Sequence, residues 1–203
     1  MKLPDFEQAK QYALNRLERE LSPDLIYHSV VHTRDDVVPA TDRLAQMEGI
    51  EGEDRLLLLT AAWFHDIGLI EQRDEHEAIG VRIASEVLPD MGYDPAQIDV
   101  ISGIIMATHL PQTPHDLLQE IMADADLDSL GREDFLAVSE KLRDEQARIG
   151  IVFSDPDWYA FELDFLQNHD YFSRAAHQLR DVQKQRNIEE MARLLDESQN
   201  RHQ

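Results

Sequence analysis

The adjacent residues His65 and Asp66 form the strongest candidate for chemistry in this chain. They end an apolar run over residues 56–64 and are followed closely by Gly68. Further histidines and an acidic stretch lie before and after them, at His32, His76, His109 and residues 124–128. Imidazole and carboxylate groups in this order can hold a divalent cation, and such a cation turns water into a nucleophile at neutral pH. The pattern therefore indicates a metal centre.

The His-Asp pair must stand at the end of a helix if both side chains are to reach one ion. Neighbouring residues inside a helix point about 100° apart, so their side chains diverge. At a helix end the backbone turns and both side chains can converge, with Gly68 as the exit from the helix. We therefore expect His65 and Asp66 at the last turn of a helix over residues 53–65.

Two further ligands are expected from elements on either side of this pair. The preceding helix offers His28 and His32, four residues apart on one face, and their spacing does not decide between them. In the acidic stretch, Asp126 points with the apolar residues of its helix, and a carboxylate that faces a core is costly unless it is paired or metal-bound. Asp126 is therefore the expected ligand, whereas we expect Asp124 and Asp128 to face solvent or to cap the helix.

His76 and His109 complete the candidate set. One opens a predicted helix and the other closes an apolar one, and their order between His65 and Asp126 fits a second metal ion that Asp66 would bridge. The mixed donor set suits manganese, iron, zinc or magnesium, with one or two ions per chain. We expect no chemical role for the remaining histidines, His115, His169, His177 and His202. Surface positions are expected for the basic residues Arg34, Arg73, Lys141 and Arg143.

The composition narrows the range of partners and compartments. The 203 residues include 19 basic and 41 acidic side chains, which gives a net charge of −22. This charge argues against a nucleic acid polymer or an anionic membrane surface as a partner. The chain has no cysteine, which excludes disulfides and thiolate zinc sites. The first residues lack the apolar segment of a signal peptide, and no apolar run is long enough for a membrane span, so we expect a cytoplasmic protein.

Helical periodicity dominates the chain and predicts an all-α fold. We expect helices over 5–20, 29–47, 53–65, 75–88, 95–108, 115–126, 133–149, 156–168 and 173–197, with a helix start also signalled at Ser22 and Pro23. Pro39 should kink the second of these helices. The apolar helix over 53–65 should be buried. Aromatic residues at helical spacing are expected in the core: Trp63, Phe64, Trp158, Tyr159, Phe161 and Phe165.

The chain is expected to divide into two parts. Residues 1–150 would form the metal-binding helical domain. Residues 151–203, which are charged and amphipathic, would form a C-terminal helical extension that packs on this domain or on a second subunit, so a homodimer is one expectation.

Three motifs in order resemble the HD-domain superfamily of metal-dependent phosphohydrolases. Residues 27–33 (YHSVVHT) are similar to its first motif, residues 62–68 (AWFHDIG) to the His-Asp motif, and residues 124–131 (DADLDSLG) to its final Asp motif. The resemblance covers about residues 24–132. It implies that the final histidine of the first motif, His32 rather than His28, is the ligand, and that Asp126 is the matching aspartate.

The resemblance implies an HD-domain helical bundle with additional C-terminal helices. It further implies a phosphohydrolase that acts on a nucleotide or another small phosphate ester through a metal-activated water. The first ion would be held by His32, His65, Asp66 and Asp126. Asp66, His76 and His109 would be the catalytic residues, with the two histidines holding a second ion or donating a proton to the leaving oxygen.

Two other classes of function remain open from the sequence. One is a two-iron HD-type oxygenase, which would use the same six ligands for redox chemistry. The other is a non-catalytic regulatory module in which the site only recognises a nucleotide or a metal. The Gly-Tyr-Pro motif of the cyclic-di-GMP branch is absent from the chain, so the resemblance does not extend to that substrate.

Overall fold

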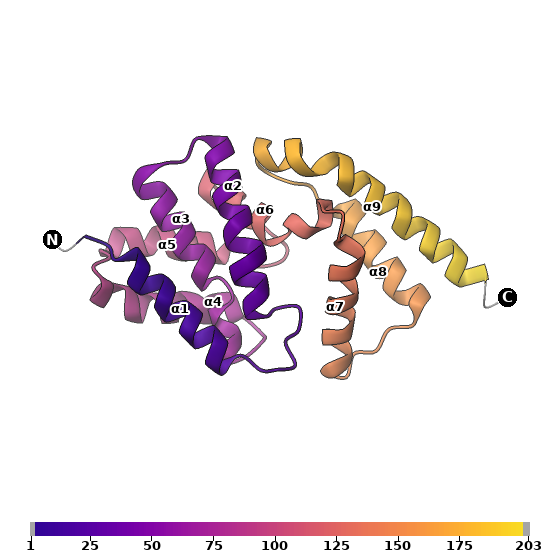
Figure 1. The fold of residues 1–203 in the computed structure, drawn as a ribbon, viewed down its shortest axis with the longest axis horizontal. Helices are drawn as coiled ribbons and strands as arrows, with labels where there is room; N and C mark the ends of the chain where they lie inside the picture. Colours follow the sequence, from indigo (N-terminus) through magenta and orange to yellow (C-terminus); the bar gives the residue numbers. More distant parts are fainter. Residues whose placement is uncertain (1–2, 201–203) are drawn as a thin grey trace. The chain divides into compact units, whose positions relative to one another are not determined.

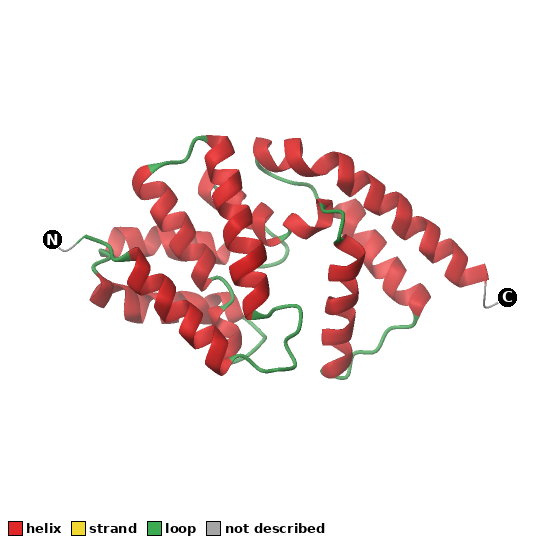
Figure 2. Ribbon diagram, in the orientation of Figure 1, coloured by secondary structure: helices red, strands yellow, loops and turns green. Residues whose placement is uncertain are grey.

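A computed structural model describes residues 3–200, and every regular element in that range is helical (Figure 2). The N-terminal half contains α1 (Phe6–Glu20), the π-helical segment η1 (His32–Val37), α2 (Val38–Glu48), α3 (Gly52–Phe64), η2 (Ile67–Ile70), α4 (His76–Val87), η3 (Leu88–Met91) and α5 (Pro95–Met106). The remainder contains α6 (Leu117–Asp126), η4 (Asp128–Gly131), α7 (Phe135–Arg148), α8 (Asp155–Asn168) and α9 (Arg174–Asn200). The all-α prediction is confirmed, and the predicted helices lie within a few residues of the observed ones.

The chain forms two compact units that do not follow one another simply along the sequence. Unit 1 comprises the residues up to Ser22 together with His28–Asp126. Unit 2 comprises Pro23–Tyr27 together with the residues from Leu127 onward. Unit 1 therefore contains α1 to α6, and unit 2 contains η4 and α7 to α9 (Figure 1).

Helix α3 is the centre of unit 1. From Leu57 to its end almost every side chain is buried, and α1, α2 and α5 pack around it. Phe64, in its last turn, is fully buried and stacks on Tyr12 of α1 with the ring centroids 6.1 Å apart. A helix that is apolar on nearly every side must be enclosed, because exposure of that surface would cost about 25 cal/mol per Å². The prediction of a buried central helix is confirmed.

The second helix begins differently from the prediction. The start signal at Ser22 and Pro23 is wrong, because residues 22–29 form no helix. The backbone groups of this segment instead find partners far along the chain, including a hydrogen bond from the Tyr27 N–H to Glu145 at 2.8 Å. The expected kink at Pro39 takes the form of the π-helical turn η1, which directly precedes α2. A proline has no N–H to continue the α-helical pattern, and a π-turn accommodates the missing bond.

Unit 2 is built around α8 and α9, which run side by side (Figure 1). Its core joins side chains from η4, α7, α8 and α9, and these are Leu127, Leu130, Phe135, Leu166 and Met191. Trp158 is fully buried and donates its indole N–H to Ser139 at 3.1 Å. Phe161, by contrast, is 47% exposed, so its predicted place in the core is wrong. The helical spacing placed Phe161 with Trp158, and the two rings do lie near each other, with centroids 5.5 Å apart, but Phe161 stays on the surface.

Unit 2 contains residues 127–150, including α7, together with the C-terminal helices. The sequence places the domain boundary at residue 150 instead. Packing units do not establish which residues fold independently, so the boundary at 150 stays a prediction. No helix within residues 3–200 is long and apolar enough to cross a lipid bilayer.

A buried acid in unit 2 makes stability depend on pH. Glu162 is 3% exposed on α8, and burial raises the pKa of its carboxyl to about 7. Below the ordinary pKa of about 4.3 the carboxyl is protonated in both the folded and the unfolded chain. Between that value and about 7 only the unfolded chain releases the proton, so the free energy of unfolding falls as pH rises through this window and then levels off.

The substitution Glu162→Gln removes this titration while keeping the size of the side chain. We predict that Glu162→Gln gains stability relative to the unaltered protein, on the order of 3 kcal/mol, as pH is raised from 4.5 to 8. Urea unfolding of both proteins at several pH values measures the difference. Parallel stability curves across this range would contradict the assignment.

Candidate metal centre

The candidate ligands come from four separate elements of unit 1. His32 opens the π-turn η1, and His65 directly follows α3 as its C-cap. Asp66 comes next, where the backbone leaves the helical conformation, and Asp126 is the last residue of α6. His76 is the first residue of α4. Because each ligand stands at the end of a helix, its side chain can reach beyond the helix surface.

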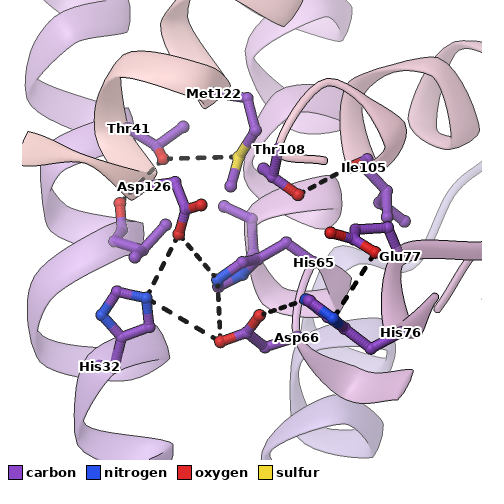
Figure 3. A network of polar contacts seen from close by, with 12 residues as sticks. His32, Thr41, His65, Asp66, His76, Glu77, Ile105, Thr108, Met122 and Asp126 are labelled. Carbon is purple, nitrogen blue, oxygen red and sulfur yellow. Dashed lines mark hydrogen bonds and ion pairs between the residues drawn. The ribbon is translucent and has the colours of Figure 1, made fainter. Parts of the chain in front are cut away.

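These side chains meet in one buried cluster (Figure 3). One potential ligand atom from each of His32, His65 and Asp66 lies within 4.8 Å of the others, and all three residues are buried. Asp126 joins them, with its Oδ1 3.3 Å from His32 Nε2 and 3.5 Å from His65 Nε2. The four residues expected to hold the first ion are thus brought together.

The imidazoles are oriented by their other ring nitrogens. His65 Nδ1 lies 2.8 Å from the carbonyl of Ala62, one turn back in α3. His76 Nδ1 lies 3.0 Å from the carbonyl of Arg73. A carbonyl accepts only, so each Nδ1 carries the proton and each Nε2 is directed toward the carboxylates. This arrangement is typical of histidines that bind metals, in which the second nitrogen is fixed by a hydrogen bond.

Two buried atoms at the centre lack an ordinary hydrogen-bond partner among residues 3–200. They are His65 Nε2 and Asp66 Oδ2, which lie 3.3 Å apart in a geometry that does not form a hydrogen bond. A buried polar atom without a partner costs about 1–3 kcal/mol, more when it is charged. A divalent cation bound by both atoms would remove that cost, so the donor set fits such an ion.

The charges in the cluster support one another. Burial alone raises the pKa of the Asp66 carboxyl, but His65 and His76 outweigh burial and hold that pKa well below its usual range. Burial lowers the pKa of His65, but Asp66 and Asp126 raise it well above its ordinary value. Asp126 is likewise held ionised by His32 and His65 against its burial, because both lower its pKa. Two carboxylates therefore stay negative in a buried place and require positive charge nearby.

Comparisons with known proteins agree with this geometry. A model of the HD domain matches residues 38–129, which include His65, Asp66, His76 and Asp126 and begin just after His32. Residues 38–129 are therefore identified as an HD domain. A comparison with curated proteins found no match. Among solved structures, the chain is similar to a predicted HD superfamily hydrolase from an uncultured Thermotogales bacterium, with 22% sequence identity and a TM-score of 0.61. The aligned region covers 92% of this chain and 91% of the Thermotogales chain. At this identity the likeness extends to the fold.

Two further residues lie beside the cluster, and the sequence did not single out the first of them. Glu77 is 6% exposed and its carboxylate lies 3.5 Å from His76 Nδ1, beside the ligand that begins α4. His28, the alternative to His32, is half-buried with its ring centroid 6.1 Å from that of His32 and 6.5 Å from that of His76. His32 Nε2 lies 3.3 Å from Asp126 and 3.9 Å from Asp66, and the choice of His32 over His28 stays a prediction. A buried acid directly after a candidate ligand is the signal that could have found Glu77.

Only one of the two histidines expected to hold a second ion lies in the cluster. His76 belongs to the cluster, with its Nε2 3.4 Å from Asp66 Oδ1 on the side opposite His32 (Figure 3). His109 is exposed, and its imidazole makes no hydrogen bond or ion pair with the cluster in the part of the chain that the structure describes. The role of His109 as a ligand stays a prediction.

Two other expectations for the acidic stretch are wrong. Asp124 is fully buried rather than exposed, and Asp128 is 4% exposed and pairs with Arg180 through two hydrogen bonds. The helical-face argument failed because α6 is enclosed on more than one side and ends at Asp126. Of the histidines given no role, His115 is exposed, His177 pairs with Asp181 and His169 is half-buried, whereas His202 lies outside the described residues.

Gly68 of η2 allows the backbone at the start of α4 to approach closely. Gly68 follows the end of α3 without the left-handed conformation that glycines often adopt after a helix. A Cβ at this position would lie 1.9 Å from the carbonyl oxygen of His76 and 2.9 Å from the backbone nitrogen of Gly80. Glu75, just before His76, has a φ of 56°, a conformation that a residue other than glycine adopts at a cost. The start of α4 is therefore pressed against η2, which keeps His76 close to Asp66.

We predict that Gly68→Ala destabilises the protein by about 1–3 kcal/mol, because backbone cannot yield as a flexible side chain can. Gly103→Ala is the matched control, since a Cβ there would meet only the side chain of Gln119, at 3.1 Å. In α5 this change should be neutral or stabilising by about 0.5–1 kcal/mol. Urea unfolding measures both effects. Equal stability of the two variants would contradict the close approach.

Proposed function

We propose that this HD-domain protein is a metal-dependent phosphohydrolase that acts on a nucleotide or another small phosphate ester. The observation that carries the proposal is the buried meeting of two imidazoles with two carboxylates, in which His65 Nε2 and Asp66 Oδ2 have no ordinary hydrogen-bond partner within residues 3–200. The relative named a predicted HD superfamily hydrolase lends support by its shared fold.

The proposed ligands of the first ion are His32, His65, Asp66 and Asp126. A divalent ion there would supply positive charge for phosphate oxygens and lower the pKa of its bound water. A bound ion would supply positive charge at the site itself, so an anionic ester could bind there although the chain carries a net charge of −22. The identity of the ion, among manganese, iron, zinc and magnesium, belongs to the proposal as well.

The roles of second-ion ligand and proton donor are proposed for side chains at the edge of the cluster. His76 is one-fifth exposed at its side chain, so it can meet a substrate as well as Asp66. Burial lowers the pKa of His76, but Asp66 outweighs burial and the net pKa is raised, which favours the protonated imidazole. His76 is therefore suited either to hold a second ion after losing that proton or to donate it to the leaving oxygen. His109 would share this role if its loop brings it to the cluster.

The central test removes the two residues that name the domain. We predict that the double substitution His65→Ala and Asp66→Ala abolishes bound metal and the hydrolysis of phosphate esters, while helix content is retained. Elemental analysis, circular dichroism and a panel of nucleotides and other phosphate esters measure the three properties.

Another His-Asp pair, at residues 115 and 116, provides the matched control. His115 and Asp116 are exposed in the loop before α6, and Asp116 accepts a hydrogen bond from the Gln119 N–H at 3.0 Å, so His115→Ala with Asp116→Asn, which keeps an acceptor oxygen, should leave metal content and activity unchanged. Full hydrolytic activity in the His65→Ala, Asp66→Ala variant would overturn the proposal. Oxygen consumption with a mixed-valence iron signal would favour the two-iron oxygenase instead. Stoichiometric metal with no turnover across the panel would favour the regulatory module.

The two outer histidines are expected to differ in their effect. His76 contacts Asp66, whereas His109 is exposed, so we predict that His76→Ala lowers activity at least about tenfold and that His109→Ala retains the first ion. Metal content and steady-state rates of both variants, measured with the same ester, test the difference. Loss of all bound metal in His109→Ala would contradict this order of importance.

A further inference from the structure

Along the sequence, the chain crosses between its two compact units within a few residues of two candidate ligands. It returns to unit 1 between Tyr27 and His28, five residues before His32. It leaves unit 1 for the last time directly after Asp126. The segments that precede one candidate ligand and follow another therefore belong to unit 2, although all the candidate ligands belong to unit 1.

The first of these segments is held by α7. The N–H of Tyr27 donates to Glu145 Oε2 at 2.8 Å, and Glu145 is fully buried. One turn along α7, Arg148 donates to the carbonyl of Pro23 at 2.9 Å and lies 3.8 Å from the carboxylate of Asp24. Glu145 is fully buried whereas Arg148 is exposed to solvent, which weakens its ion pair, so Glu145 is taken as the stronger of the two anchors.

The second segment is held by α9. Arg180 donates two hydrogen bonds to Asp128, at 2.7 and 2.8 Å, and Asp128 is nearly completely buried. Asn187, two turns further along α9, donates to the carbonyls of Leu130 and Arg132, both at 2.9 Å. Gly131 lies so close to α9 that a Cβ would stand 2.5 Å from the Cβ of Arg180. The backbone that follows Asp126 is thus fixed at several successive residues.

We propose that Glu145 and Arg180 are positioning residues of the metal centre, which act by holding the chain segments that carry His32 and Asp126. The proposal rests on the proposed function, because it concerns the binding of that same ion. Ligands must be held within about 0.5 Å of the bonding geometry, and an Asp at the end of a helix has backbone support on only one side. Both anchors lie beyond residues 38–129, so the helices outside the HD match acquire a role in the HD chemistry.

The experiment compares two arginines of unit 2 that are equally exposed. The side chains of Arg180 and Arg143 are each 19% exposed, and Arg143 pairs with Asp155 rather than with a segment next to a ligand. Arg180→Met should raise the dissociation constant for Co²⁺ about tenfold, the lower end of the range for groups that orient ligands, and alter the ligand-field absorption. Arg143→Met should leave both unchanged. Arg180→Lys, which keeps the charge but loses the paired geometry, should lie between the two.

A matched pair at Glu145 tests the other anchor. Glu145→Gln keeps an acceptor oxygen for the Tyr27 N–H, whereas Glu145→Met removes it, so only the second should weaken Co²⁺ binding. Amide hydrogen exchange of the metal-free proteins provides a readout that does not depend on an ion. Exchange should rise at residues 125–128 in Arg180→Met and at residues 27–32 in Glu145→Met, while residues 60–65 stay protected.

The possible outcomes distinguish failure of the positioning role from failure of the proposed function. Equal Co²⁺ affinity in Arg180→Met, Arg143→Met and the unaltered protein would overturn the positioning role and leave the proposed function standing. Unchanged amide exchange in both Met variants would overturn it as well. Failure of the unaltered protein to bind Co²⁺ would instead overturn the proposed function, on which the positioning role rests.

Discussion

Asp66 carries a negative charge into a region where only 4% of its surface reaches water. A buried carboxylate is tolerated only when positive charge and hydrogen-bond donors surround it. In this protein the surrounding groups are imidazoles: His65 and His32 on one side and His76 on the other. Asp126 adds a second carboxylate to the same cluster, which increases the need for positive charge. The arrangement of the helices in unit 1 can be understood as the means of keeping these groups together.

Three features of the backbone meet that need. The apolar surface of α3 fixes the end of the helix in the core, so that His65 and Asp66 emerge at a defined point. Gly68 allows the start of α4 to approach without a side chain between them, which sets the distance from Asp66 to His76. The π-turn before Pro39 sets the direction of His32. Each feature is local, and each places one ligand relative to the same carboxylate.

The sequence predicted the parts of this site that depend on local patterns. A long apolar run ending in His-Asp predicted both the buried helix and the place of His65 and Asp66. The final aspartate motif indicated Asp126, and the first motif separated His32 from His28. The structure brings these residues together, their role as ligands stays a prediction, and each prediction rests on residues a few positions apart. The superfamily resemblance was carried by the same short motifs, which is why the family could be recognised without any knowledge of the packing.

What the sequence missed depends on partners far along the chain. Asp128 looked like a solvent-facing residue because its partner, Arg180, is 52 positions away. The helix start at Ser22 and Pro23 failed because the backbone of that segment bonds to Glu145, 118 positions beyond Tyr27. Phe161 follows the buried Trp158 at helical spacing, yet 47% of Phe161 is exposed because other elements do not cover it. No pattern within one helix contains this information, since it arises only when separate elements pack.

The account rests on imidazoles and carboxylates from separate elements sharing one cation. The most direct measurement is a crystal structure of the purified protein with anomalous diffraction recorded at the absorption edge of its bound metal. The account predicts a peak about 2.0–2.2 Å from Nε2 of His32, Nε2 of His65 and carboxylate oxygens of Asp66 and Asp126. An anomalous peak at other residues, or fully ordered side chains in this cluster with no ion in metal-saturated crystals, would contradict it.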